Sequence, residues 1–148
     1  MKISKKCRYG IRALIDLAAN SENEYMVLGN IAERNGISSQ YLEQVFASLR
    51  RAGIVKSVKG SQGGYLLKYP SSSITVASII QALEGTYYLD DEETKTEESA
   101  AGIAETIQED IVDRVNHGLD QILQNLTLAD LEESFQERQS GGQEMYYI

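Results

Sequence analysis

The chain has 148 residues, of which 42% are hydrophobic, so it can form one domain, or a small domain with an extension, around an ordinary core. Its single cysteine excludes an internal disulfide and any metal site built from several cysteines. No apolar run approaches the roughly 20 residues of a membrane-spanning helix, and no signal-peptide pattern opens the chain, so we expect a cytoplasmic protein.

The formal net charge of −8 is unevenly distributed. Residues 1–70 hold 11 Lys and Arg against 5 Asp and Glu, a net of +6, whereas residues 71–148 hold 3 against 17, a net of −14. This asymmetry is typical of a protein with one half that binds nucleic acid and another that faces away from phosphate. Charge runs are also common on solvated surfaces, so the asymmetry supports this interpretation but does not decide it.

The first half of the chain predicts three helices and two strands. Apolar residues at helical spacing predict a helix over about residues 4–20 and a short one around 28–35, which Gly36 ends. A third helix follows the candidate N-cap Ser38 and closes near Gly53. Its apolar stripe has the spacing i, i+3, i+4, i+7 and consists of Leu42, Val45, Phe46 and Leu49.

The stripe leaves the other side of this third helix polar. Residues 54–58 and 65–68 then read as two strands joined by a glycine-rich turn, with Lys56 and Lys59 at the joint. A polar helix followed by a basic hairpin is the layout of a winged helix-turn-helix, a module that reads double-stranded DNA.

The second half predicts more helices. Thr75 is a plausible N-cap for a helix that Gly85 ends, and residues 90–98 form an acidic, apolar-poor linker that we expect to be mobile. A long helix follows, with a final helix beginning near Thr127. The stripe of the long helix is formed by Ile103, Ile107, Ile111, Val115, Leu119, Ile122 and Leu126.

This stripe is too long for one small domain to cover. Two copies packed together would bury it, so we predict a homodimer through Ile103, Ile107, Ile111, Val115, Leu119 and Ile122. The alternative is a helix that lies along its own domain. The expected fold is mainly α with a small β-wing. It comprises a DNA-binding domain (1–85), an acidic linker (86–101), a helical dimerisation region (102–138) and a flexible tail (139–148).

Several short motifs combine into a family resemblance. They include Ile31-Ala32-Glu33, Tyr41-Leu42-Glu43-Gln44, Leu49-Arg50-Arg51-Ala52-Gly53-Ile54-Val55, Gly63-Gly64-Tyr65-Leu66-Leu67 and Asn125-Leu126-Thr127-Leu128-Ala129-Asp130-Leu131. Together with Ile3 to Gly10 they make the chain similar to the Rrf2 family of winged-helix transcription regulators.

The resemblance implies a symmetric dimer on an imperfect palindrome, most simply a repressor. The third helix would enter the major groove and the wing the neighbouring minor groove. By this analogy the DNA side of the third helix presents Ser38, Ser39, Gln40, Tyr41, Glu43 and Gln44. The wing contributes Lys59, Ser61 and Gln62, and the candidate phosphate contacts are Arg8, Arg50, Arg51 and Lys56. Each lone side chain could equally be a solvated surface residue, and Arg51 could interact with the helix dipole.

The chain departs from the iron–sulfur members of that family. Those members carry three cysteines before the dimerisation helix, whereas residues 86–101 contain none. Carboxylates do not replace thiolates around a cluster, and Cys7 lies on the apolar side of the first helix. We therefore expect no cofactor and no iron–sulfur cluster.

The last four residues, Met145, Tyr146, Tyr147 and Ile148, are apolar and aromatic. They resemble the C-terminus of the cysteine-metabolism branch of the family, whose partner is cysteine synthase. The resemblance implies that Ile148 could enter that enzyme's active site. The alternative is that this tail packs on its own dimer.

Other function classes fit the sequence less well. The one histidine, His117, has no evident nucleophile beside it, and residues 60–64 lack the Gly-Lys-Ser/Thr ending of a P-loop, so we do not expect an enzyme. Two alternatives remain: a regulator of the same family that answers a different signal or small ligand, and a winged helix that binds protein instead of DNA.

Overall fold

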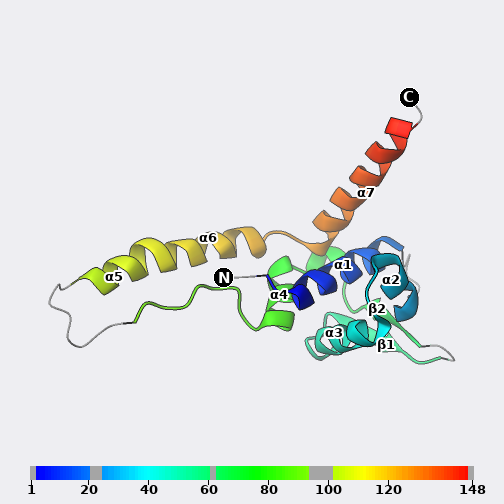
Figure 1. Ribbon diagram of the computed structural model, residues 1–148, viewed down its shortest axis with the longest axis horizontal. Helices are drawn as coiled ribbons and strands as arrows, with labels where there is room; N and C mark the ends of the chain where they lie inside the picture. The colour runs from blue at the N-terminus through cyan, green and yellow to red at the C-terminus, as the bar shows by residue number, and fades with distance from the viewer. Residues whose placement is uncertain (1–2, 21–24, 61–62, 94–101, 147–148) are drawn as a thin grey trace.

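The structure is a computed structural model that describes residues 3–20, 25–60, 63–93 and 102–146, with side chains as far as Gly142. It confirms a mainly helical fold with one two-stranded antiparallel hairpin. A globular winged-helix domain carries two projections, a long helical arm on one side and α7 on another (Figure 1). The elements of the domain are α1 (Lys5–Asn20), α2 (Leu28–Asn35), α3 (Ser39–Arg51), β1 (Val55–Val58), β2 (Gly64–Leu67), η1 (Ser71–Ser73) and α4 (Val76–Glu84).

The core lies where α1, α3 and α4 meet. The largest fully buried side chains include Phe46, Leu14, Leu17, Leu49 and Ile79. The capping residues act as the sequence predicts: Ser38 accepts a hydrogen bond from the Tyr41 amide at 3.1 Å, and Thr75 accepts one from the Ser78 amide at 3.1 Å. These caps satisfy helix amides that have no partner within the helix, so they fix where α3 and α4 begin.

A polar network joins α2 to α1. The buried carboxylate of Asp16 accepts hydrogen bonds from Arg34 Nε at 3.0 Å and from Asn35 Nδ2 at 2.9 Å. The bond to Asp16 raises the pKa of the Arg34 guanidinium, which therefore stays charged. Gly36 then ends α2 with φ of 64°, the left-handed conformation that glycine adopts without strain. The network and the turn together orient α3 relative to α1.

The wing is held against the domain by a third short segment. Val55 pairs with Leu67 and Val58 with Gly64 in the hairpin, and Met26 forms an isolated bridge with Tyr65. The ring centroids of Tyr65 and Phe46 lie 5.0 Å apart, so β2 also packs on α3.

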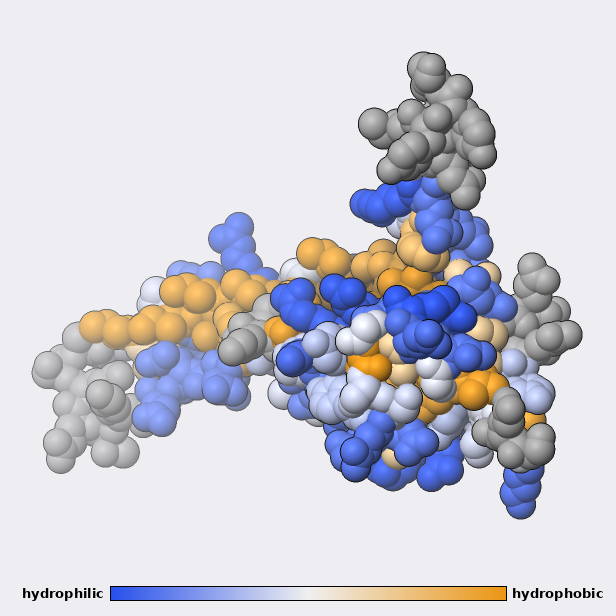
Figure 2. Space-filling model, turned by 45° about the vertical axis from the view of Figure 1, so that its right-hand side comes forward, coloured by the Kyte–Doolittle hydropathy of each residue, from blue (hydrophilic) through white to orange (hydrophobic). Residues whose placement is uncertain are grey.

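Beyond the acidic segment the chain forms one unbroken helical arm, which we define as Ile103–Leu123. It consists of α5 (Ile103–Ile107), a π-helical turn η2 (Gln108–Asp113) and α6 (Arg114–Leu123). Four of its stripe residues are 41–62% exposed: Ile103, Ile111, Val115 and Ile122. Ile107 and Leu119 are half-buried, and Leu119 packs partly against the core of its own domain. Figure 2 shows hydrophobic atoms along much of the arm.

Part of the segment that the sequence predicts as a mobile linker is bonded to the arm. The Leu89 amide donates to Asn116 Oδ1 at 2.8 Å, and the Glu92 amide donates to Gln108 Oε1 at 2.7 Å. Residues 86–93 therefore run beside the arm (Figure 1). Side-chain oxygens of the arm accept the hydrogen bonds of their backbone amides, as a neighbouring strand would do in a sheet. Residues 94–101 lie outside the described part of the chain.

The last helix, α7 (Leu128–Tyr146), begins where the sequence predicts and runs further. Thr127 Oγ1 accepts from the Asp130 amide at 3.1 Å, while Asp130 Oδ2 accepts from the Thr127 amide at 3.0 Å. The sequence predicts a flexible tail from residue 139, whereas α7 continues as a helix to Tyr146. The helix runs through Gly141 and Gly142, although each glycine costs about 1 kcal/mol relative to alanine in a helix. None of the helices in the described ranges has the length and apolarity needed to cross a membrane.

Gly64 offers a test of how the wing is attached. A Cβ at this position would lie 2.8 Å from the carbonyl oxygen of Met26, which is backbone and cannot move aside. We expect Gly64→Ala to lower the free energy of unfolding by about 1–3 kcal/mol, as overpacking does. Denaturant unfolding followed by circular dichroism measures the change.

Gly60 is the matched control for this substitution. It lies at the same hairpin, and a Cβ there would meet no atom within 4 Å. Gly60→Ala should therefore leave the free energy of unfolding within about 0.5 kcal/mol of the parent. Equal stability of the two variants would contradict the packing of Gly64 against residue 26.

Candidate nucleic-acid interface

The exposed face of α3 carries polar side chains along its length. Its apolar face is completely buried, because Leu42, Val45, Phe46 and Leu49 each have 0% exposure. Helical geometry then places the remaining residues outside. The exposed members of the predicted set on this helix and its cap are Ser38, Ser39, Gln40, Glu43, Gln44, Arg50 and Arg51, with Tyr41 half-buried. One continuous surface thus offers hydroxyl, amide and carboxylate groups, the groups that hydrogen-bond base edges.

A cluster of cations connects the ends of α1 and α3. Lys6 Nζ and Arg51 Nη2 both donate to Ser48 Oγ, at 3.3 Å and 3.2 Å. Ser48 is itself only 9% exposed, so its hydroxyl lies at the base of this cluster. Two cationic groups this close together have the charge and the donors to hydrogen-bond a phosphate group. Arg51 was predicted from the sequence, whereas Lys6 was not.

Lys6 escaped prediction because its neighbour is distant in sequence. It is 42 residues from Ser48, and no local spacing connects the two. The available signal was the run of basic residues Lys2, Lys5, Lys6 and Arg8 at the start of the chain. In the structure, Arg8 Nε donates to the Ile3 carbonyl at 3.2 Å, and its side chain remains exposed.

An aromatic pair continues the same surface. The rings of Tyr9 and Tyr41 meet edge to face with centroids 5.7 Å apart, and Lys5 Nζ lies 5.4 Å from the centroid of Tyr9. This contact joins α1 to the first turn of α3, and it holds the Lys5 ammonium over a π face. The residues that the sequence assigns to different helices therefore form one basic and aromatic surface.

The wing borders this surface. Lys56 and Lys59 are exposed, while the predicted contacts Ser61 and Gln62 lie outside the described residues. A hollow of about 370 Å³ lies between the wing and the start of α2, and Glu43 of α3 is part of its lining together with Leu28, Ser57 and Gly63. The carboxylate of Glu43 is thus placed between the helix and the hairpin, where it can accept a hydrogen bond from cytosine N4 in a major groove.

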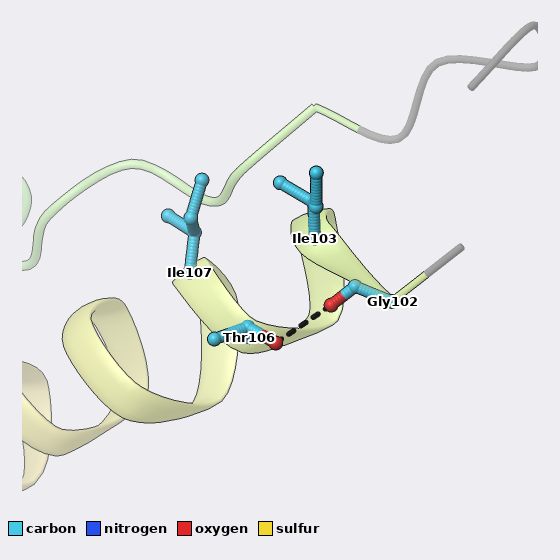
Figure 3. A pocket seen from close by; sticks show the side chains of 4 residues that line it. All are labelled: Gly102, Ile103, Thr106 and Ile107. Carbon is cyan, nitrogen blue, oxygen red and sulfur yellow. Dashed lines mark hydrogen bonds between the residues drawn. The ribbon is translucent and has the colours of Figure 1, made fainter. Parts of the chain in front are cut away.

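The free end of the arm forms a second, apolar surface. Ile103 and Ile107 project from the same side of α5, while Thr106 turns away and donates to the Gly102 carbonyl at 2.7 Å (Figure 3). Together these four residues line a shallow hollow of about 320 Å³. The arm's predicted stripe thus begins at its free end, and three further members, Ile111, Val115 and Ile122, remain largely exposed.

The thiol chemistry of the chain does not fit an iron–sulfur cluster. Such clusters are held mainly by cysteine thiolates, and Cys7 is the sole cysteine of the sequence. It is completely buried in α1, and burial raises the pKa of its thiol to about 11, which disfavours the thiolate that a metal requires. Across the described ranges, no three His, Cys, Asp or Glu side chains gather into a potential metal site.

Comparison with known proteins identifies relatives of the whole arrangement. Residues 3–134 match the model of the Rrf2 family, described as iron-dependent transcriptional regulators. The HTH-type transcriptional regulator IscR of Yersinia enterocolitica is 36% identical over 135 residues, which cover 88% of this chain and 79% of that protein.

Solved structures agree with this match. The structure of CymR, the global cysteine regulator of B. subtilis, superposes with a TM-score of 0.76 at 34% identity, covering 90% of this chain and 98% of that one. The structure of T. potens IscR has a TM-score of 0.73 at 37% identity and covers 94% and 91% of the two chains. The overall fold is thus shared with proteins of both names.

Proposed function

Because this chain belongs to the Rrf2 family of transcriptional regulators, we propose that it binds a palindromic DNA operator as a homodimer and represses transcription. The observation that carries the proposal is the exposed polar face of α3, bordered by the Lys6–Arg51 cluster on one side and the wing on the other. This face would enter the major groove while the cations contact phosphates on both sides.

The charge distribution supports this orientation. The half of the chain that contains α3 and the wing has a net charge of +6, and the half that contains the arm has −14. Phosphates attract the first half and repel the second, so the protein approaches DNA with the winged helix foremost. Such a regulator works where the chromosome is, and we infer a cytoplasmic location for that reason.

The dimer is proposed to form through the arms. Residues 86–93 are bonded to Gln108 and Asn116 of their own arm, whereas Ile103, Ile111, Val115 and Ile122 remain exposed on it. A second copy related by a two-fold axis presents the same apolar face, so each would cover the other. The two-fold axis would also place one recognition helix on each half of a palindrome.

We also propose that the regulator works without an iron–sulfur cluster. The support is the chemistry of its donors, since the sole thiol is buried in the core of α1. The signal would then come from a protein or a small molecule. The resemblance of the last four residues to those of a cysteine regulator favours cysteine synthase as that protein, with cysteine metabolism as the regulated process. Residues 147–148 lie outside the described part of the chain, so this component rests on sequence alone.

DNA binding is tested by substitutions of residues proposed to contact base edges and of a residue proposed to contact phosphate or the minor groove. We expect Gln40→Ala and Glu43→Ala to change the preferred sequence, at a cost of about 1–3 kcal/mol for each lost base contact. Lys59→Ala should weaken binding to all duplexes alike, because phosphate or groove-electrostatic contacts carry little sequence information. Selection from a random duplex library followed by gel-shift titration measures both effects.

The parent protein and a remote variant provide the controls. Parent affinity should fall by about 10³–10⁵ between 50 and 200 mM salt if roughly 6–10 phosphates are contacted. Glu109→Ala, which removes an exposed carboxylate of the arm, should keep the parent's sequence preference. Absence of duplex binding by the parent at low salt would favour the alternative, a winged helix that binds protein.

The dimer interface is tested at Ile111, which is 53% exposed in the single chain. We expect Ile111→Glu to convert the dimer to a monomer, because an unpaired carboxylate would be buried between two apolar faces. Gln121→Glu adds the same charge to an exposed position off the stripe and should leave the dimer intact. Sedimentation velocity distinguishes the states, and a dimeric Ile111→Glu variant would disprove the proposed interface.

The C-terminal partner is tested by removing Ile148. Purified cysteine synthase should be retained by the full chain and lost, at least tenfold, from a chain that ends at Tyr147, since the terminal carboxylate and its side chain are the proposed ligand. Ser140→Ala, upstream on α7, is the control and should behave as the parent. Equal recovery with and without Ile148 would leave the signal to another protein or to a small ligand.

A further inference from the structure

The base of the arm is fixed to the domain by a short backbone ladder. The Val76 amide donates to the Leu126 carbonyl at 2.8 Å, and the Leu128 amide donates to the Ile74 carbonyl at 2.8 Å. Thr75 and Thr127 form an isolated bridge between these bonds, and Leu128 is completely buried. This attachment fixes the position of the base, but a single short ladder acts as a pivot and leaves the direction of a long helix open.

A second attachment lies about two turns along the arm. Both oxygens of Asp120 accept from the Tyr88 hydroxyl, at 2.8 and 2.7 Å, and Asp120 Oδ1 also accepts from the Tyr87 hydroxyl. Gln124 Nε2 donates to the Tyr87 oxygen at 3.3 Å. We call this group of four residues the clasp. Asp120 is six residues from Leu126, which corresponds to about 9 Å along a helix.

The clasp is anchored on the side of the domain as well as on the arm. Tyr87 follows α4 by only three residues and is 5% exposed, so its ring is part of the core cluster. The rings of Tyr87 and Tyr88 contact each other with centroids 5.0 Å apart. Bonds between a charged carboxylate and hydroxyl groups are directional and stronger than neutral ones, so they define an angle as well as a distance.

No other bonded attachment of this kind joins the arm to the domain within the described ranges. Toward the free end, Asn116 and Gln108 bond to residues 89–92, which continue from the clasp and are not part of the globular domain. The ladder and the clasp, together with Leu119 and Leu123, which pack partly against the core of the domain, therefore determine the direction of the arm. Ile103 to Ile122 spans about 30 Å at 1.5 Å per residue, so a small change of angle is amplified at the free end.

We propose that the clasp is a positioning device that sets the angle between the arm and the winged-helix domain, and through it the half-site spacing that the dimer prefers. This inference rests on the proposed dimeric DNA binding. A tilt of about 6° moves the free end of a 30 Å arm by about 3 Å, close to the ~3.4 Å rise of one base pair. Tyr87, Tyr88, Asp120 and Gln124 act on DNA only through this angle.

The experiment compares half-site spacings with clasp and control variants of the full chain. Asp120→Ala removes the acceptor, and the Tyr87→Phe/Tyr88→Phe double variant removes both donors while it keeps the rings. Asp110→Ala removes a carboxylate from an exposed position of the same arm and is the matched control. Gel-shift titrations use the parent's selected palindrome, versions lengthened or shortened by one base pair, and a single half-site.

We expect the clasp variants to remain dimeric and to bind the single half-site as tightly as the parent. Their preference for the optimal spacing over its neighbours should fall by about fivefold to thirtyfold, the factor expected when one or two net hydrogen bonds no longer hold the angle. The Asp110→Ala variant should keep the parent's preference. A general loss of folding would instead weaken the single half-site too, which separates a structural effect from a positioning effect.

Two results would overturn the inference. The first is a dimeric clasp variant with the parent's spacing preference, which would leave the proposed function standing. The second is a parent that is monomeric or indifferent to palindromes, which would remove the proposed function as well. The single variant Tyr88→Phe provides a test in case the double variant misfolds. Tyr88 is 41% exposed and the change deletes only its hydroxyl, so this variant should fold. Its spacing preference should lie between those of the parent and the double variant.

Discussion

The burial of one face of α3 is the constraint on which the rest of the surface depends. Phe46 and Leu49 are completely buried, and the helix can satisfy them in only one rotational orientation. Gln40, Glu43 and Arg50 are exposed as a consequence of that orientation, not because anything holds them outward. The same packing brings Ser48 to the base of the Lys6–Arg51 cluster. A hydrophobic contact thus determines where a polar recognition surface lies.

In the arm, too, the burial of one helix face determines which residues are exposed, but here the exposed residues are apolar. Its inner face is satisfied within the chain, since Ala104 and Val112 are buried while Asn116 and Gln108 bond to residues 89–92. Its outer face exposes large aliphatic side chains that no described residue of the chain covers. An exposed stripe of this length on an otherwise acidic helix indicates an association surface. The winged helix and the arm are therefore both amphipathic, and we propose that the first contacts DNA and the second contacts another copy of the chain.

The sequence was sufficient to predict helices and their exposed residues wherever buried residues recur with a helical period. The stripe of Leu42 to Leu49 predicts α3 and its exposed residues, and Ser38 and Thr127 cap the helices that their side chains suggested. The linker was predicted less well, because no period marks the bonds from Tyr87 and Tyr88 to Asp120, more than 30 residues away. Lys6 escaped notice for the same reason. Polar contacts between distant residues depend on the tertiary fold that brings them together, and local patterns do not encode them.

The clasp region also shows how this chain positions a cysteine-free segment between α4 and the arm, within a family described as iron-dependent. Between α4 and the arm, the described residues Tyr87 to Glu92 are bonded by hydroxyl, amide and carboxylate groups of the protein. These hydrogen bonds between protein groups position residues 87–92 against the arm. They also give the arm a direction by contacts that are individually weak and jointly specific. A joint of this kind is rigid enough to select a spacing, and a perturbation of a few bonds is sufficient to change it.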